Sequence, residues 1–196
     1  MNIASDVVIG QYSLVGVEDG SNTTGQIARG CSIGSFCHIT QSVTLGPDVY
    51  VDNYVRIGDE TTVGERTRLL FNATIDKRAR IGHDCIISGN VVNDVEIGDF
   101  VSYQGNIAHA HRNPLIPWDD YWESSPRILD QSVVGVDALL IGPVSIGPRS
   151  YIGAGEVVRH DVPPDSVLFK GEISPLSKWR GLIQVRDRER MRLVQD

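Results

Sequence analysis

The chain has 196 residues, of which 41% are hydrophobic and 22% charged, and its formal net charge is −7. These values are typical of one soluble globular domain with room for an appendage. The negative charge disfavours a nucleic-acid or anionic-membrane partner, because either would favour a basic face. The start, MNIASDVVIG, has no basic region followed by an apolar core, and no apolar run approaches the ~18 residues of a membrane span. We therefore expect a cytoplasmic protein.

Aliphatic residues recur at every sixth position from Ile3 to Ile87, and only Ser21 breaks the row. A small or β-branched residue comes four positions after most of them, and glycine often follows directly. Neither the period of a helix nor the alternation of a long strand fits this spacing. A strict period of six predicts short strands joined by tight turns and stacked as coils, with the aliphatic side chains directed into the coil axis.

The cysteines Cys31, Cys37 and Cys85 all fall in the small inward position of the repeat. They are odd in number and form no CxxC pair, so they suggest neither a disulfide framework nor a cysteine zinc site. We expect them to fill the core as compact hydrophobic groups.

The phase of the repeat changes further along the chain. It slips after Ile87, resumes with Tyr103 in an inward position, disappears, and returns at Val134. The interruption at 108–127 predicts an excursion loop, and rigid repeat scaffolds place recognition and chemistry on such loops. Extrapolation from Tyr103 puts His109 inward and His111 outward, where the loop departs.

The chain is predicted to divide into a coil over 1–168 and an exit segment with a C-terminal helix over 169–196. DVPPDSVLFKG is typical of an exit strand, and SPLSKWRGLIQVRDRERMRLVQD begins with a Ser-Pro helix start and is rich in arginine. Such a tail would cover the open end of the last coil, which otherwise exposes strand edges.

The repeat over roughly 3–168 resembles the hexapeptide-repeat, left-handed parallel β-helix family. The handedness and the three-sided section come from this resemblance. The implied fold is all-β: a left-handed parallel β-helix of hexapeptide repeats with an excursion loop and a C-terminal α-helix.

Two segments resemble the hexapeptide acyltransferases more closely, including the xenobiotic and galactoside/maltose acetyltransferase groups. AHRNPLIPW is similar to their loop, with a histidine-basic pair at 111–112 and a proline-aromatic pair at 117–118. VVGVDALLIGPVSIGPRSYIGAGEVVRHDVPPDSV is similar to their last coils. Three short motifs within it match, at 153–155, 157–158 and 162–163.

In that family a histidine is the general base that removes a proton from the acceptor as it attacks the acetyl-CoA thioester. The resemblance places this role on His111, with His109 as the competitor or as a residue that orients it. An imidazole has an unperturbed pKa near 6.5 and accepts a proton at about pH 7 without large tuning. The developing oxyanion needs a donor such as a backbone N–H.

The resemblance also implies substrate and cofactor residues within a homotrimer. The pantetheine arm of acetyl-CoA would lie between subunits against Gly135, Gly142, Gly153, Ala154 and Lys170. In the loop, carboxylates could orient the imidazole or hold an amino-sugar nitrogen, and aromatic rings could stack on a sugar or pin the loop. These residues are Trp118, Asp119, Asp120, Trp122 and Glu123. The sequence departs from the family at LLIGP, which lacks an aromatic, and at GEISPLSKW, where Lys178 is displaced.

Three function classes follow. The first is an acetyl-CoA-dependent O- or N-acetyltransferase acting on a sugar-like small molecule, with no metal. The second is a metal enzyme of the γ-carbonic-anhydrase type, which needs three imidazoles and an open position. Only His83, His109 and His111 could supply them, and their spacings of 26 and two differ from that family's. The third is a non-catalytic scaffold or degenerate acyltransferase.

Overall fold

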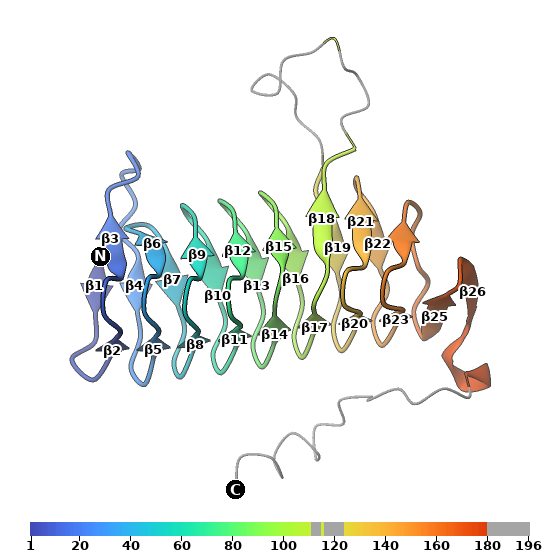
Figure 1. Ribbon diagram of the computed structural model, residues 1–196, viewed down its shortest axis with the longest axis horizontal. Helices are drawn as coiled ribbons and strands as arrows, with labels where there is room; N and C mark the ends of the chain where they lie inside the picture. The colour runs from blue at the N-terminus through green and yellow to red at the C-terminus, as the bar shows by residue number, and fades with distance from the viewer. Residues whose placement is uncertain (111–114, 116–123, 180–196) are drawn as a thin grey trace, which may run out of the picture.

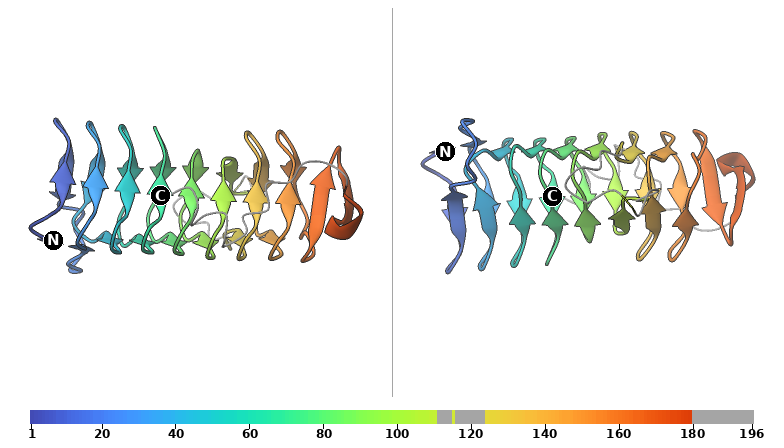
Figure 2. Two further views of the ribbon diagram at one scale, coloured as in Figure 1. Left: turned by 90° about the horizontal axis from the view of Figure 1, so that it is seen from below. Right: turned by 90° about the horizontal axis from the view of Figure 1, so that it is seen from above.

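The computed structural model describes residues 1–110, 115 and 124–179. Within them the chain winds into a three-sided coil whose strands form three sheets, here A, B and C (Figures 1 and 2). The predicted all-β coil of hexapeptide repeats is confirmed. None of the helices in the described residues is long and apolar enough to cross a membrane.

Sheet A has eight strands: β1 (Asn2–Ile3), β4 (Gln26–Ile27), β7 (Thr44–Leu45), β10 (Thr62–Val63), β13 (Arg80–Ile81), β16 (Glu96–Ile97), β19 (Arg127–Ile128) and β22 (Ser145–Ile146). Sheet B has ten: β2 (Val8–Ile9), β5 (Ser32–Ile33), β8 (Tyr50–Val51), β11 (Arg68–Leu69), β14 (Ile86–Ile87), β17 (Ser102–Tyr103), β20 (Val133–Val134), β23 (Tyr151–Ile152), β25 (Ser166–Phe169) and β26 (Glu172–Pro175). Sheet C has eight: β3 (Leu14–Val17), β6 (His38–Thr40), β9 (Arg56–Ile57), β12 (Thr74–Ile75), β15 (Asn90–Val91), β18 (Asn106–Ala108), β21 (Leu139–Ile141) and β24 (Val157–Val158).

The inward aliphatic row forms the core. Equivalent residues of successive coils pair in register, as Leu45, Val63 and Ile81 do in sheet A. All three are buried, because each coil covers the one before it. At the N-terminal end Ile3 is 44% exposed, since no described coil lies on its other side.

The small inward position serves a second purpose besides filling space. Where the residue is Ser, Thr or Cys, its hydroxyl or thiol donates a hydrogen bond to a corner carbonyl of the next coil. Thr67 Oγ1, for example, donates to Gly82 O at 2.8 Å. Cys85 Sγ makes the same bond to Gly98 O at 3.1 Å. All three cysteines are free and buried, so their predicted core role is confirmed.

Corner residues in the left-handed region stack as outward-facing ladders. Tyr12, Phe36 and Tyr54 all have positive φ, and neighbouring rings stand 5.1 and 5.0 Å apart along the corner between sheets B and C. Arg66 and Asp84 occupy the equivalent positions on the corner between sheets A and B and form a bidentate ion pair. Stacking between coils offsets the cost of the left-handed backbone.

Two turns from sheet B to sheet C are shorter than the rest. Val91 follows Ile87 after four positions in place of six, and Ile107 follows Tyr103 in the same way. Glycine is required in the first turn because the φ of Gly89 is +89° and a Cβ there would lie 2.0 Å from a carbonyl oxygen of the next coil. The buried Tyr103 fills the axis here, and its hydroxyl donates to a backbone carbonyl at 2.7 Å.

Both long insertions leave the corner between sheets C and A. The first, 18–25, explains why Ser21 breaks the aliphatic row: it belongs to an insertion and not to a strand. Asp19 fixes this insertion by accepting hydrogen bonds from the hydroxyl and the backbone N–H of Ser42. The second is the excursion between β18 and β19 (Figure 1).

The chain leaves the coil differently from the expectation of a helix starting at Ser174. β25 and β26 form an antiparallel hairpin that extends sheet B, and a 3-10 turn follows at Leu176–Lys178. The hairpin forms because β25 covers the exposed edge of β23 and leaves its own edge for β26. Residues 180–196, on which the rest of the predicted helix falls, lie outside the described residues.

Candidate functional site

The root of the excursion lies on the corner between sheets C and A, after β18. His111, the predicted base, lies outside the described residues. So do the five residues predicted to bind the acceptor, Trp118, Asp119, Asp120, Trp122 and Glu123. On the returning side, Ser125 Oγ donates to Asn93 O at 2.6 Å and fixes the excursion to the turn after β15.

His109 does not occupy the inward position predicted for it. Ile107 takes that position, where it is buried and pairs with Leu140. The prediction was wrong because the turn after Tyr103 is two residues short, which moves the register forward. His109 therefore falls two positions after the inward residue and is half-buried.

Four of the five predicted cofactor residues occupy two different corners, and the fifth, Lys170, lies on the terminal hairpin. Gly135 and Gly153 stack in successive coils on the corner between sheets B and C, and Ala154 follows there. A Cβ on Gly135 would lie 2.6 Å from Ala154 N, so the two coils approach this closely only because the residue is glycine. Gly142 lies on the corner between sheets C and A, where its N–H donates to Ala108 O at 2.9 Å. It therefore neighbours His109 and not the other glycines.

Lys170 stands at the tip of the terminal hairpin, near the Gly153 corner. Glu156 holds this tip by accepting the backbone N–H of Lys170 and, at 3.1 Å, that of Gly171. The Lys170 ammonium lies 5.6 Å from the centre of the Phe169 ring and is exposed. An exposed cation at this tip could receive an anionic group.

His83 has the geometry of an oriented acid–base group, which the sequence pattern did not reveal. On the corner between sheets A and B, its Nδ1 lies 2.7 Å from Asp84 and its Nε2 lies 3.0 Å from Asp99. Burial alone would raise the pKa of Asp84, but hydrogen bonds from Arg66 and His83 outweigh it and lower that pKa, so the carboxylate is charged. The ring also packs edge-on against Phe100. The sequence analysis named His83 only as a possible metal ligand and did not predict this pairing.

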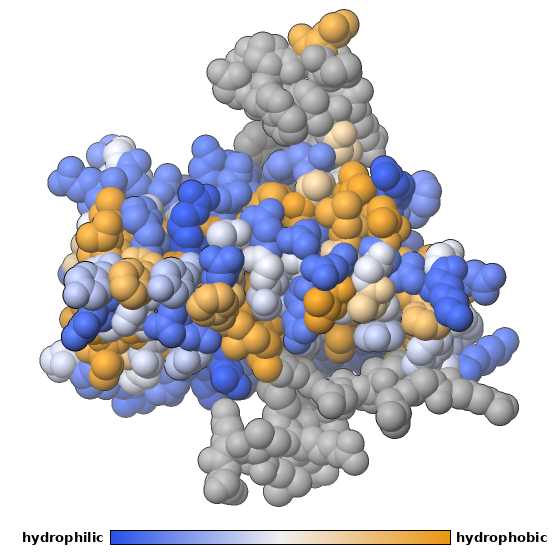
Figure 3. All heavy atoms as spheres, in the orientation of Figure 1, coloured by the Kyte–Doolittle hydropathy of each residue, from blue (hydrophilic) through white to orange (hydrophobic). Residues whose placement is uncertain are grey.

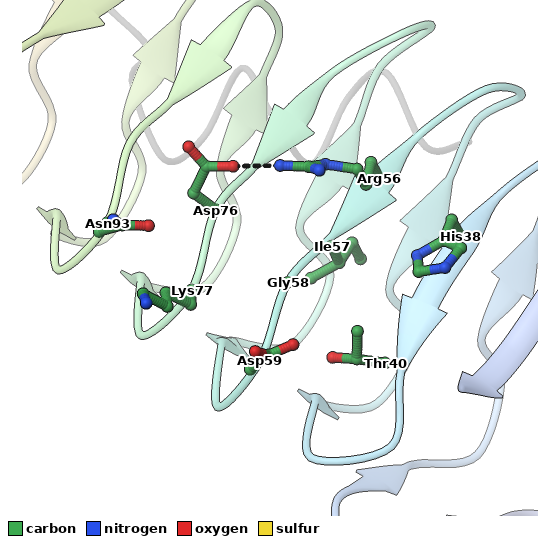
Figure 4. A pocket seen from close by; sticks show the side chains of 9 residues that line it. All are labelled: His38, Thr40, Arg56, Ile57, Gly58, Asp59, Asp76, Lys77 and Asn93. Atoms are coloured by element: carbon green, nitrogen blue, oxygen red, sulfur yellow. Dashed lines mark hydrogen bonds and ion pairs between the residues drawn. The ribbon is translucent and has the colours of Figure 1, made fainter. Parts of the chain in front are cut away.

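A polar groove with a volume of about 370 Å³ opens on the outer face of sheet C (Figure 4). Its two ends are marked by His38 and Asn93, and the ion pair of Arg56 with Asp76 crosses it. The sequence analysis did not single out these residues. The sequence carried no signal for them, because outward positions differ from coil to coil in all three sheets.

The metal-enzyme alternative gains no support from the described part of the chain. No group of three His, Cys, Asp or Glu side chains there could hold a metal ion. His83 and His109 lie on different corners, while His111 is outside the described residues.

The comparisons with known proteins point to one group. No family model matches the chain. The bifunctional protein GlmU of Agrobacterium fabrum is 34% identical over 108 residues, which are 50% of this chain and 23% of that protein. GlmU of Nitrosospira multiformis is 27% identical over 183 residues, 92% of this chain and 33% of that protein. The chain thus spans about a quarter to a third of these relatives.

One solved structure shares the fold over most of both chains. It is a mutant of AntD, an N-acyltransferase from Bacillus cereus, in complex with dTDP-4-amino-4,6-dideoxyglucose and coenzyme A. Its sequence is 16% identical, the TM-score is 0.51, and the match covers 90% of each chain.

Proposed function

We infer an acyl-transfer activity from one premise: the chain belongs to the hexapeptide-repeat, left-handed β-helix family of acyltransferases. We propose that it moves an acyl group from an acyl-CoA, acetyl-CoA being the first donor to test, to a hydroxyl or amine of a sugar or aminosugar. The AntD complex, with coenzyme A and an aminosugar nucleotide, is a precedent for both substrate classes. The expected cytoplasmic location stays a prediction.

The observation that carries the proposal is the carboxylate-backed imidazole of His83. Asp84 fixes the ring through Nδ1, and Arg66 fixes Asp84 in turn through two hydrogen bonds of 2.9 and 2.7 Å. A base oriented by a third group in this way is the recurring arrangement of acyl transfer. Nε2 lies 3.0 Å from Asp99, whose side chain is 40% exposed. Before the ring can accept a proton, Asp99 has to move away and Nε2 has to be unprotonated.

The reaction requires one proton acceptor and one oxyanion donor. As the acceptor's oxygen or nitrogen attacks the thioester carbonyl, the imidazole takes its proton and a tetrahedral oxyanion forms. Collapse of the oxyanion breaks the C–S bond, and the imidazolium returns the proton to the leaving thiolate. A backbone N–H at a corner would stabilise the oxyanion. His111 and His109 stay the alternative bases proposed from the sequence.

We propose that two copies of the chain complete the site, within the homotrimer that the family resemblance implies. His83 lies on the corner between sheets A and B, whereas Gly135, Gly153 and Lys170 lie on or beside the corner between sheets B and C. His109 lies on the third corner, with Gly142. Corners of one rigid coil cannot approach one another, so a second copy has to bring a histidine to the acyl-CoA. Light scattering during size exclusion tests the trimer.

The decisive experiment measures coenzyme A release from acetyl-CoA with a panel of amino sugars and sugars. Alanine replaces His83, His109 and His111 singly. His160, an exposed imidazole two coils beyond His109 on the corner between sheets C and A, is replaced in the same way as the comparison for loss of a neighbouring histidine. Loss of the base should lower kcat by about 10²–10⁴-fold. If none of the three variants loses activity, the histidine-base proposal is wrong.

Asp84→Asn and Asp99→Asn separate the roles around His83. If His83 is the base, Asp84→Asn lowers kcat and shifts the pH profile, because the ring loses its orienting charge. Asp99→Asn replaces the charged partner of Nε2 by a neutral amide, so the ring is released more easily and kcat stays unchanged or rises. A scaffold, by contrast, would show neither acetyl transfer nor saturable heat on titration with acetyl-CoA.

A further inference from the structure

The groove on sheet C contains an unsatisfied polar group at its floor. Thr40 lines the groove and is only 7% exposed, and its hydroxyl has no hydrogen-bond partner. Such an orphaned hydroxyl is unfavourable to folding, and buried polar groups are normally paired. A register shift between β3 and β6 sets Thr40 opposite Val17, and bulges of this kind re-aim side chains beside binding sites. Because the hydroxyl oxygen is itself shielded from solvent, a ligand would reach it only after rotation about χ1.

The charges of the groove are balanced. Arg56 is paired with Asp76, and the ammonium of Lys77 is offset by the carboxylate of Asp59 on the same edge of the groove (Figure 4). A phosphate group would gain from the cations but would be repelled by the two carboxylates. Closely spaced donors and acceptors of no net charge suit a neutral ligand rich in hydroxyl groups.

The length of the groove exceeds one sugar ring. It runs from His38 on β6, past β9 and β12, to Asn93 beyond β15. Three strand spacings correspond to about 14 Å. One more strand spacing leads to β18, after which the excursion begins. Where the chain comes back from the excursion, Ser125 Oγ donates a hydrogen bond to Asn93 O. The Asn93 end of a bound ligand therefore lies beside the excursion.

We propose that this groove binds a neutral carbohydrate of two or more rings, whose end beside the excursion is the acyl acceptor when the base is the alternative on that corner, His109, and not His83. The acceptor role rests on the proposed function, whereas the binding itself does not. Apolar and hydrophilic side chains are mixed over the rest of this face (Figure 3), and the groove is set apart by its unsatisfied hydroxyl.

The test measures binding of N,N′-diacetylchitobiose, cellobiose and maltose by calorimetry and ligand-observed NMR, without acyl-CoA. Glucose 1-phosphate is the anionic comparison. We expect at least one neutral disaccharide to saturate, and Thr40→Val and Asp76→Asn each to weaken it about tenfold or more. Preferential binding of glucose 1-phosphate, or no saturation by any neutral disaccharide, would overturn the proposal.

Stability separates a binding role of Thr40 from a structural one. Thr40→Val removes an unpaired hydroxyl at constant shape, so it should raise the midpoint of thermal unfolding while it weakens the sugar. The matched control is Thr67→Val, since Thr67 is fully buried but donates to Gly82 O at 2.8 Å, away from the groove. It should lower the midpoint and leave disaccharide binding unchanged. If Thr40→Val binds the disaccharide as well as the original protein does, the binding proposal is wrong, even when acetyl transfer is observed. If the disaccharide binds as predicted but no acetyl transfer is found, only the proposed enzymatic activity is wrong.

Discussion

Replacing Gly89 by alanine should destabilise the coil far more than the same change at Gly155. Both glycines have positive φ, +89° and +70°, so an alanine at either costs about 1–2 kcal/mol for its left-handed backbone. The surroundings differ. A Cβ on Gly89 would lie 2.0 Å from the carbonyl oxygen of Gly105, whereas a Cβ on Gly155 would have nothing within 4 Å.

The magnitude follows from that overlap. A carbon–oxygen contact near 3.5 Å requires the two coils to separate locally by roughly 1.5 Å. Because the opposing atom belongs to the backbone, no side-chain rotation relieves the clash. Overpacking of this kind costs about 1–3 kcal/mol, and a weakened hydrogen bond from Asn90 N to Gly105 O costs about 1 kcal/mol more. We expect a loss of about 3–6 kcal/mol for Gly89→Ala and about 1–2 kcal/mol for Gly155→Ala.

Urea unfolding followed by circular dichroism gives both free energies. Amide hydrogen exchange shows where the damage lies, because neighbouring coils of a repeat protein open locally. Faster exchange should appear at Asn90 and its neighbours in Gly89→Ala and nowhere near them in Gly155→Ala. If the two variants lose equal stability, the close approach of the shortened turns does not hold these coils together.

Three further predictions follow from single contacts. Ser132→Ala removes a buried hydroxyl that donates to the next coil at 2.9 Å, and it should lower the free energy of unfolding by about 1 kcal/mol. Hydrogen bonds from Ser42 hold the pKa of folded Asp19 well below its unfolded value near 3.9. The stabilisation is therefore complete above the unfolded pKa and is lost as the pH falls through the folded pKa. Asp19→Asn should flatten the acid branch of a curve of unfolding free energy against pH. Cys31 and Cys37 are buried, and burial raises the pKa of both thiols, so Ellman's reagent should react with them only after unfolding.

Much of the coil could be predicted because one physical rule repeats. An inward residue has to be aliphatic or small, so the inward residue at every sixth position from Ile27 to Ile87 can be recognised in the sequence. The second short turn was not predicted because its inward residue, Ile107, is β-branched and lies four positions after Tyr103. It therefore also fits the position of the small or β-branched residue in an unshortened repeat. Two registers were then consistent with the sequence, and only the pairing of Ile107 with Leu140 distinguishes them.

The site was less predictable because contacts between coils join residues far apart in sequence. Asp84 is adjacent to His83 in the chain, but Arg66 and Asp99, which complete the cluster, come from other coils. The C-terminal hairpin was missed for a similar reason. The pairing of β25 with β26 depends on an exposed edge of the last coil, and local propensity carries no signal of that edge.

The regularity of the coil also indicates where binding, rather than stability, has shaped the sequence. Every outward side chain has its equivalents about 4.8 Å above and below it, so stability alone favours columns of like or paired groups. The ring column that includes Tyr12, Phe36 and Tyr54 follows that rule. The first outward column of sheet C sets His38 beside Arg56, a pairing of two basic groups that gives no stacking or ionic gain. Sheet B breaks the same rule where Arg68 lies beside Ile86, so the groove on sheet C is distinguished by its unpaired threonine hydroxyl, and that hydroxyl is the feature that a ligand would explain.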